Sequence, residues 1–217
     1  MAARTGERKD QILQTLAQML EDPAGERVTT AALAARLEFS EAALYRHFRG
    51  KAQMFEGLIE FIEQTVFALV NRITSEEKSG VRQLEAVIGV LLAFAQKNRG
   101  MTRVLIGDAL VNEDAQLQVR INQLHDRLEA VLKQALRFGV TQKEIAEDVD
   151  VTAHANILMS FVIGRWHQYA KSGFKRDPVD LWPKAKEPVI VHKHDWTVIG
   201  SIPRTSRSGK KRKAVSQ

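Results

Sequence analysis

Residues 29–48 read TTAALAARLEFSEAALYRHF, and this stretch decides the fold of the N-terminal part of the chain. Each half carries two large apolar residues four positions apart, so each half presents one apolar face if it is helical. Phe39 and Ser40 separate the halves, and serine is a good helix N-cap. We therefore predict two short helices, at 30–37 and 40–48, packed across a tight turn.

Two short helices in this arrangement are typical of a helix-turn-helix, whose second helix enters the major groove of DNA. A slim polar helix face reads base edges, while flanking hydroxyls and cations bind phosphates. A cap role for Thr30, and ordinary surface positions for Tyr45 and His47, are the alternatives. The candidate DNA-binding residues are Thr29, Thr30, Ser40, Glu41, Ala42, Tyr45, Arg46, His47, Arg49 and Lys51.

The rest of the chain is predicted to be helical as well, because apolar residues recur three and four positions apart. The fold class is therefore all-α. Besides the two short helices, we expect helices near residues 7–20, 51–74, 81–97, 101–111, 114–138 and 150–171. The predicted organisation is a helix-turn-helix DNA-binding domain at 1–52, a helical dimerisation and partner-binding domain at 53–182, and a basic, disordered tail at 183–217.

Composition narrows the function. The 217 residues include no cysteine, which excludes disulfides, thiolate metal sites and cysteine nucleophiles. The net charge of +6 arises in the segment 184–217, so charge alone is a weak argument for DNA binding by the folded body. We find no glycine-rich phosphate loop, metal-binding helix motif or nucleophile elbow, and we predict neither an enzyme nor a cofactor. The one candidate metal cluster, His192 to Asp195, falls in the tail. No apolar run is long enough to span a membrane, and we expect a cytoplasmic protein.

Residues 29–34 and 43–55 resemble the TetR family of bacterial DNA-binding proteins, above all in Tyr45, His47, Phe48 and Lys51. The resemblance implies a three-helix DNA-binding domain, completed by the start of a long fourth helix, and a C-terminal helical domain. It further implies a homodimer that forms through the helices at 114–138 and 150–171 and reads a near-palindromic site in double-stranded DNA.

Within that family, residues 40–48, 58–63, 96–103 and 120–124 resemble the nucleoid occlusion factors. This implies a nucleoid-associated protein that binds chromosomal sites and, once on DNA, binds the C-terminal tail of the division protein FtsZ and antagonises its polymers. The resemblance places the FtsZ tail on Phe61, Val90, Lys97 and Asn98. The alternatives are that Phe61 packs in the core and that Lys97 and Asn98 form an ordinary helix end.

The chain departs from the pattern of these factors at three positions. Leu69 replaces a basic groove residue, Ala93 replaces a glycine, and Glu38 occupies a turn position that usually carries glycine. If that turn needs a positive φ angle, a residue with a side chain costs on the order of 1 kcal/mol there.

The main alternative function is a ligand-responsive repressor of the same family. In that case an apolar cavity in the C-terminal domain would hold a small molecule whose binding separates the two recognition helices. The residues that would line this cavity are Phe94, Leu110, Leu128, Phe161 and Trp166.

Overall fold

The computed structural model describes residues 2–22 and 28–190, and these residues form helices and connecting turns without a strand. This confirms the predicted all-α class. The helices are α1 (Ala2–Met19), α2 (Thr30–Arg36), α3 (Glu41–Tyr45), α4 (Lys51–Glu76), α5 (Gly80–Lys97), α6 (Arg99–Leu105), the 3-10 helix η1 (Asp108–Leu110), α7 (Ala115–Thr141), α8 (Val151–Lys171) and α9 (Trp182–Ile190). None of the helices in these ranges combines the length and the apolar character that crossing a membrane requires.

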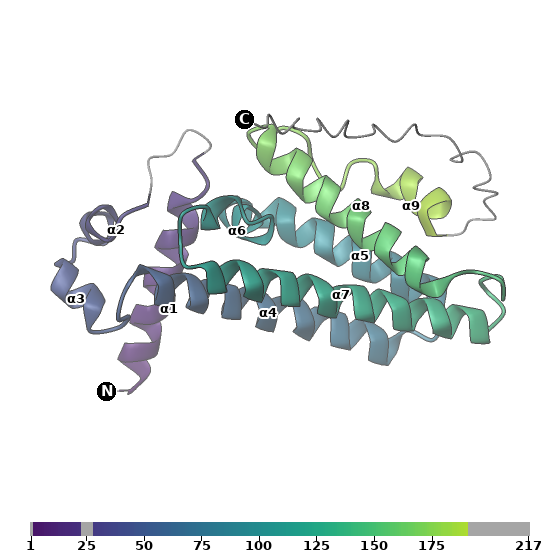
Figure 1. Cartoon of the computed structure of the whole chain (residues 1–217). Coiled ribbons are helices and arrows are strands. Elements are labelled where there is room, and N and C mark those ends of the chain that lie inside the picture. The colour runs from purple at the N-terminus through teal and green to yellow at the C-terminus, as the bar shows by residue number, and fades with distance from the viewer. Residues whose placement is uncertain (1, 23–27, 191–217) are drawn as a thin grey trace, which may run out of the picture.

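The long helices set the shape of the molecule (Figure 1). Helices α4 and α7 run along its long axis, α5 packs on both of them, and α8 crosses above α7. Helix α1 stands upright at one end, and the α2–α3 pair lies beyond it. The small N-terminal domain is therefore at one tip of an elongated body.

Helix α4 connects the two parts because its apolar stripe continues from the N-terminal domain into the body. Residues three and four positions apart fall on one helical face, which is buried along the whole length of this helix. The buried residues of α4 are Met54, Phe55, Leu58, Ile59, Ile62, Val66 and Val70.

A second connection joins α1 to α6 by direct backbone packing. A Cβ atom on Gly100 would lie 1.9 Å from the carbonyl oxygen of Ala17, so this crossing requires glycine. Nearby, Arg103 donates hydrogen bonds to the carbonyl oxygens of Leu20 (3.3 Å) and Asp22 (3.0 Å) at the end of the α1 segment. The arginine thus satisfies helix-end carbonyls that have no partner within α1.

Residues 183–190 differ from the prediction, because they form most of α9 rather than the start of a tail. Trp182 packs against Phe161, with 5.9 Å between ring centroids, and the carbonyl oxygen of Ile190 lies 3.2 Å from Nε2 of the buried His154. Lys186 adds an ion pair with Glu85 of α5 (2.9 Å). Two prolines in this short segment hide its helical periodicity, although a proline fits the first turn of a helix. The remainder of the expected tail, with the candidate metal cluster at His192 to Asp195, lies outside the described residues.

Candidate DNA-binding surface and partner groove

The turn between α2 and α3 has hydrogen bonds that fix the angle between these helices. The Phe39 N–H donates to the Ala34 carbonyl oxygen (2.9 Å), and the Glu38 N–H donates to that of Ala35 (3.1 Å), as in a Schellman motif. Glu38 has a φ of 57°, so this turn does adopt the positive φ angle that favours glycine. A residue with a side chain costs about 1 kcal/mol or more in this conformation. The turn that orients α3 is therefore strained at Glu38.

Thr29 and Ser40 act as the N-caps of the two short helices. Oγ1 of Thr29 accepts a hydrogen bond from the Ala32 N–H (3.1 Å), and Oγ of Ser40 accepts one from the Ala43 N–H (3.2 Å). Each hydroxyl still has its own proton to donate. A cap role and a phosphate contact are therefore compatible at both positions.

Three further candidates lie together between α2 and α3. Oγ1 of Thr30 donates to Oε2 of Glu41 (2.8 Å), and the Tyr45 hydroxyl lies at 3.5 Å from the same threonine oxygen. Tyr45 is 48% exposed, so its ring lies on the outer surface rather than under the helix pair. This network braces α3 against α2 on the side that carries the candidate DNA contacts.

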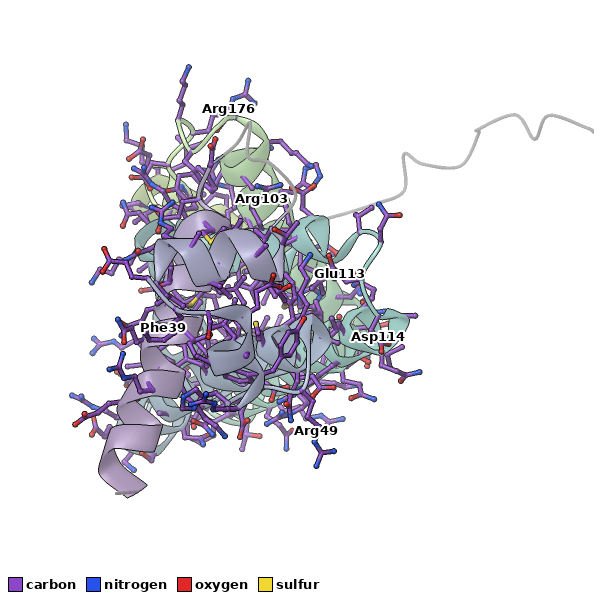
Figure 2. All side chains as sticks on the ribbon, turned by 90° about the vertical axis from the view of Figure 1, so that its left-hand side faces the viewer. Phe39, Arg49, Arg103, Glu113, Asp114 and Arg176 are labelled. Atoms are coloured by element: carbon purple, nitrogen blue, oxygen red, sulfur yellow. The ribbon has the colours of Figure 1, made fainter. Side chains whose placement is uncertain are left out.

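Helix α3 is shorter than predicted, because it ends at Tyr45 and residues 46–48 form a turn. Ala42, Arg46 and Arg49 are exposed, and Arg49 lies at the edge of the DNA-binding domain when this end is viewed directly (Figure 2). His47 is half-buried, and no residue in the described part of the chain forms a hydrogen bond with its Nδ1. Two cations therefore flank the small outer face that Ala42 leaves on α3.

Lys51 has an intramolecular partner that the sequence did not reveal. Its Nζ lies 2.5 Å from Oε1 of Glu113, in the loop between η1 and α7, and the side chains are only 21% and 11% exposed. The same ammonium lies 5.6 Å from the ring centroid of Phe55. The lysine predicted to bind a DNA phosphate is thus paired with a carboxylate of the C-terminal domain.

A second charged cluster lies at the same junction. Asp108 accepts hydrogen bonds from Lys171 of α8 and from Nε of Arg103 (3.0 Å). Burial by itself would raise the pKa of Asp108, but the hydrogen bonds from Lys171 and Arg103 outweigh it and hold this pKa below the ordinary value. The carboxylate therefore stays ionised and links α6, η1 and α8.

The four predicted partner residues lie along the α4–α5 pair. Arg120 of α7 contacts Glu63 (2.7 Å), and Arg127 lies 4.0 Å from the ring centroid of Phe67, so these α4 residues face α7. Phe61 lies on the opposite flank of α4, toward α5, and is 45% exposed. It does not pack in the core.

We give the name partner groove to the surface between two stripes on the neighbouring helices α4 and α5. The stripes are Phe61, Thr65 and Leu69 on α4 and Ala86, Val90, Ala93 and Lys97 on α5. Members of each stripe are three or four positions apart, so they share one helical face. All seven are partly or fully exposed. Because α4 and α5 are antiparallel, Phe61 lies level with the C-terminal end of α5, where Asn98 donates Nδ2 to the Phe94 carbonyl oxygen (2.8 Å). Asn98 therefore also has the structural role of ending this helix.

The five residues of the alternative ligand cavity are packed among other side chains. Four of the five are buried, namely Phe94, Leu110, Leu128 and Trp166. The fifth, Phe161, packs its ring at an angle against the ring of Trp182. The Trp166 indole N–H donates to the Leu91 carbonyl oxygen (3.0 Å). A surface pocket of about 500 Å³ lies between α4, α5 and α7, and none of the five residues lines it.

Comparisons with known proteins agree with this architecture. Residues 12–58 match the bacterial regulatory proteins of the tetR family, and residues 78–190 match the SlmA-like form of the Tetracyclin repressor-like C-terminal domain. The nucleoid occlusion factor SlmA of Marinomonas sp. is 44% identical over 199 residues, which is 92% of this chain and 96% of the relative. SlmA of Idiomarina loihiensis is 46% identical over 180 residues, 83% of this chain and 92% of the relative.

Solved structures with lower identity share the fold. A TetR transcription regulator from Haloarcula marismortui has a TM-score of 0.72 at 14% identity, covering 85% of this chain and 97% of its own. FadR of Bacillus subtilis, solved with stearoyl-CoA, has a TM-score of 0.67 at 16% identity, covering 84% and 98%. The two matched families and the relatives at more than 40% identity show that this chain belongs to the TetR family of DNA-binding regulators, within its SlmA-like group of nucleoid occlusion factors.

Proposed function

We propose that this protein binds near-palindromic chromosomal sites as a homodimer and, in that state, binds the C-terminal tail of FtsZ and antagonises division-ring assembly over the nucleoid. The observation that carries the proposal is that one continuous helix, α4, begins beside the helix-turn-helix and carries the half-exposed Phe61 in the body. The candidate DNA-binding surface and the partner groove thus share helix α4.

For DNA, α3 offers a small outer face with cations at its edge. Ala42 leaves room for a base edge, Glu41 and Tyr45 lie beside it, and Arg46 and Arg49 are placed to bind phosphates. The Thr30–Glu41 hydrogen bond holds this face in one orientation before DNA arrives. Such preorganisation lowers the entropic cost of binding.

For the dimer, α8 offers an outward stripe of small or apolar residues. Ala153, Ile157, Ser160 and Gly164 are spaced three or four apart and are all exposed, with Ile157 at 45%. A Cβ atom on Gly164 would have no neighbour within 4 Å among residues 2–22 and 28–190, so the packing of these residues does not require glycine there. A second copy packed on this stripe and on the neighbouring face of α7 forms a four-helix interface with twofold symmetry, which suits a near-palindrome.

For FtsZ, the partner groove combines an apolar wall with a cation at one end. Phe61 and Leu69 are 45% and 40% exposed, and both offer apolar surface to a docked peptide. Lys97 closes the groove at the C-terminal end of α5, where an acidic residue of the peptide is favoured. DNA binding at the start of α4 reaches this groove through the helix itself, and a coupling of about 1 to 3 kcal/mol is enough to restrict FtsZ binding to DNA-bound copies.

The test is a fluorescence anisotropy titration of a labelled FtsZ C-terminal peptide, with and without a palindromic duplex selected from a random pool. We expect tighter peptide binding in the presence of the duplex. Phe61→Ala should abolish peptide binding and leave duplex binding unchanged. Leu181→Ala is the matched control, because Leu181 is also an exposed apolar residue (56%) but lies just before α9, outside the partner groove and the proposed dimer face. Good duplex binding without peptide binding in either condition would overturn the FtsZ part of the proposal.

A further inference from the structure

A cluster of unpaired cations adjoins the end of the partner groove. Lys97 and Arg99 lie at the α5–α6 junction, and Lys175 and Arg176 follow the end of α8. All four side chains are exposed, and none of them forms an ion pair with another residue in the ranges 2–22 and 28–190. We call Arg99, Lys175 and Arg176 the basic corner.

Aromatic contacts fix the two halves of the basic corner against each other. The Arg99 guanidinium lies 5.8 Å from the ring centroid of Phe174, and Tyr169 meets the same ring edge-on at 5.1 Å. The Tyr169 hydroxyl donates to the carbonyl oxygen of Gln96 (3.1 Å) at the end of α5. The cations after α8 are therefore held beside the end of the groove.

The backbone of this loop is strained and densely hydrogen-bonded. Phe174 has a φ of 61°, which for a bulky residue costs on the order of 1 to 3 kcal/mol. The conformation is held by the Phe174 N–H, which donates to the Tyr169 carbonyl oxygen (2.9 Å), and by Oγ of Ser172, which accepts from the N–H groups of Lys175 (3.1 Å) and Arg176 (2.9 Å).

The acidic residue nearest in sequence does not pair with the cations of the corner. The Asp177 carboxylate accepts hydrogen bonds from Nε2 of Gln96 (2.5 Å) and from the Val179 N–H (2.8 Å). Arg165 donates to the backbone carbonyl oxygens of Asp177 and Pro178 (2.5 and 3.2 Å) and fixes the loop from below. The corner thus presents three exposed cations on a fixed backbone, and none of the three is ion-paired within residues 2–22 and 28–190.

We propose that the basic corner binds an acidic segment of the protein partner, immediately next to the stretch that fills the partner groove. This inference rests on the proposed function and adds a second subsite to it. Lys97 is the last residue of α5 and belongs to the groove, and Arg99 follows two residues later, so a peptide leaving the groove at that end meets the corner directly. Carboxylates of such a peptide replace water around cations that are already held in place.

The position of the corner favours a protein partner over DNA. Helix α1 stands between α6 and the α2–α3 pair (Figure 1), so the corner lies on the other side of α1 from the recognition helix. In the end-on view, Arg176 and Arg49 lie at opposite edges of the molecule (Figure 2). A duplex seated on α3 therefore contacts the surface around Arg49 rather than the basic corner.

The experiment compares five labelled peptides on the full chain with the selected duplex present. They are the FtsZ tail alone, the tail with a run of glutamates added at either end, and the same peptides with glutamines instead. We expect glutamates at one end to tighten binding about three- to tenfold at low salt, as a few exposed ion pairs can. This gain should disappear in Lys175→Glu/Arg176→Glu and near 1 M salt, where the Debye length is about 3 Å.

A matched reversal, Lys78→Glu/Lys143→Glu, changes two exposed lysines in the turns at the far end of α4 and α7 and should keep the gain. Two results would overturn the basic corner and leave the FtsZ proposal standing. In one, added glutamates tighten binding equally in the two double variants; in the other, glutamates at neither end of the tail tighten binding to the parent protein. If the tail alone does not bind, the proposed function fails. A polyglutamate peptide then tests the basic corner by itself, and we expect Lys175→Glu/Arg176→Glu to abolish binding of that peptide. If Lys175→Glu/Arg176→Glu weakened duplex binding and left the binding of all peptides unchanged, the corner would be assigned to DNA and the inference would be overturned.

Discussion

Nζ of Lys51 lies 2.5 Å from Oε1 of Glu113, and this ion pair joins the first residue of α4 to the loop before α7. Both side chains are mostly buried, so a Lys51 that moves to a DNA phosphate leaves a carboxylate without its countercharge. The adjacent Asn112 has a φ of 66°, which shows that the loop takes an uncommon conformation to place Glu113. On the proposal that Lys51 binds a DNA phosphate, Glu113 competes with that phosphate for the same ammonium group.

This competition predicts that Glu113→Gln tightens binding to the selected duplex, by about two- to tenfold, because the amide holds Lys51 less strongly. The melting temperature should fall at the same time, since the variant lacks an ion pair between the domains. Anisotropy titration and thermal denaturation measure the two effects. Glu85→Gln is the control, because it also removes an ion pair between two helices, that of Glu85 on α5 with Lys186 on α9 (2.9 Å), but lies away from the N-terminal domain. Weaker duplex binding by Glu113→Gln would mean that the ion pair positions Lys51 for DNA.

Arg49 provides a test of the phosphate contacts through salt dependence. It is exposed, and only its backbone N–H is used, donating to Oε1 of Gln53 (2.6 Å). For Arg49→Gln we expect a shallower plot of log affinity against log salt, by about 0.9 for each phosphate that the arginine no longer neutralises and twice that in a dimer. Arg137→Gln, an exposed arginine near the far end of α7, should leave the slope unchanged. An unchanged slope for Arg49→Gln as well would remove Arg49 from the DNA surface.

A substitution at Gly164 tests the proposed dimer face without disturbing the fold of the single chain. The space above it is open, so Gly164→Leu should fold normally and even gain helix propensity, while the larger side chain blocks close approach of a second α8. Sedimentation velocity should show a shift toward monomer, and affinity for a full palindrome should fall much more than affinity for a half-site. Ser160→Ala, a small change on the same stripe, is the control and should remain dimeric. A stable dimer in Gly164→Leu would place the interface elsewhere.

The sequence predicted local features well and long-range partners poorly. The helix-turn-helix and the Ser40 cap follow from residues a few positions apart, and the positive φ at Glu38 could be anticipated because glycine is usual there. The cap of α2 is Thr29, whereas the sequence suggested Thr30, which is the first residue of the helix. The partner of Lys51 lies 62 positions away, and no local pattern indicates such a contact. Helix α9 was missed for a different reason, because its stability comes from the packing of Trp182 and Ile190 on other helices rather than from its own periodicity.

His125 predicts how stability depends on pH. Burial lowers its pKa, against a smaller opposite effect of its hydrogen bond with the Leu105 backbone, and its Nε2 has no hydrogen-bond partner among the residues that the structure describes. The unfolded chain, with a histidine pKa of about 6.5, therefore binds a proton that the folded chain resists as the pH falls below that value. The free energy of unfolding should decrease between about pH 7 and about pH 5.

His125→Asn separates this contribution from those of the other five histidines. The asparagine amide cannot take up a proton in this range, so urea denaturation at about pH 7 and about pH 5 should show a smaller loss of stability than in the parent protein. The variant starts from a lower stability, because asparagine has no ring to pack on Trp166, whose ring centroid lies 5.9 Å from that of His125. The decisive quantity is therefore the difference between the two pH values. An equal difference in parent and variant would show that other groups cause the acid destabilisation.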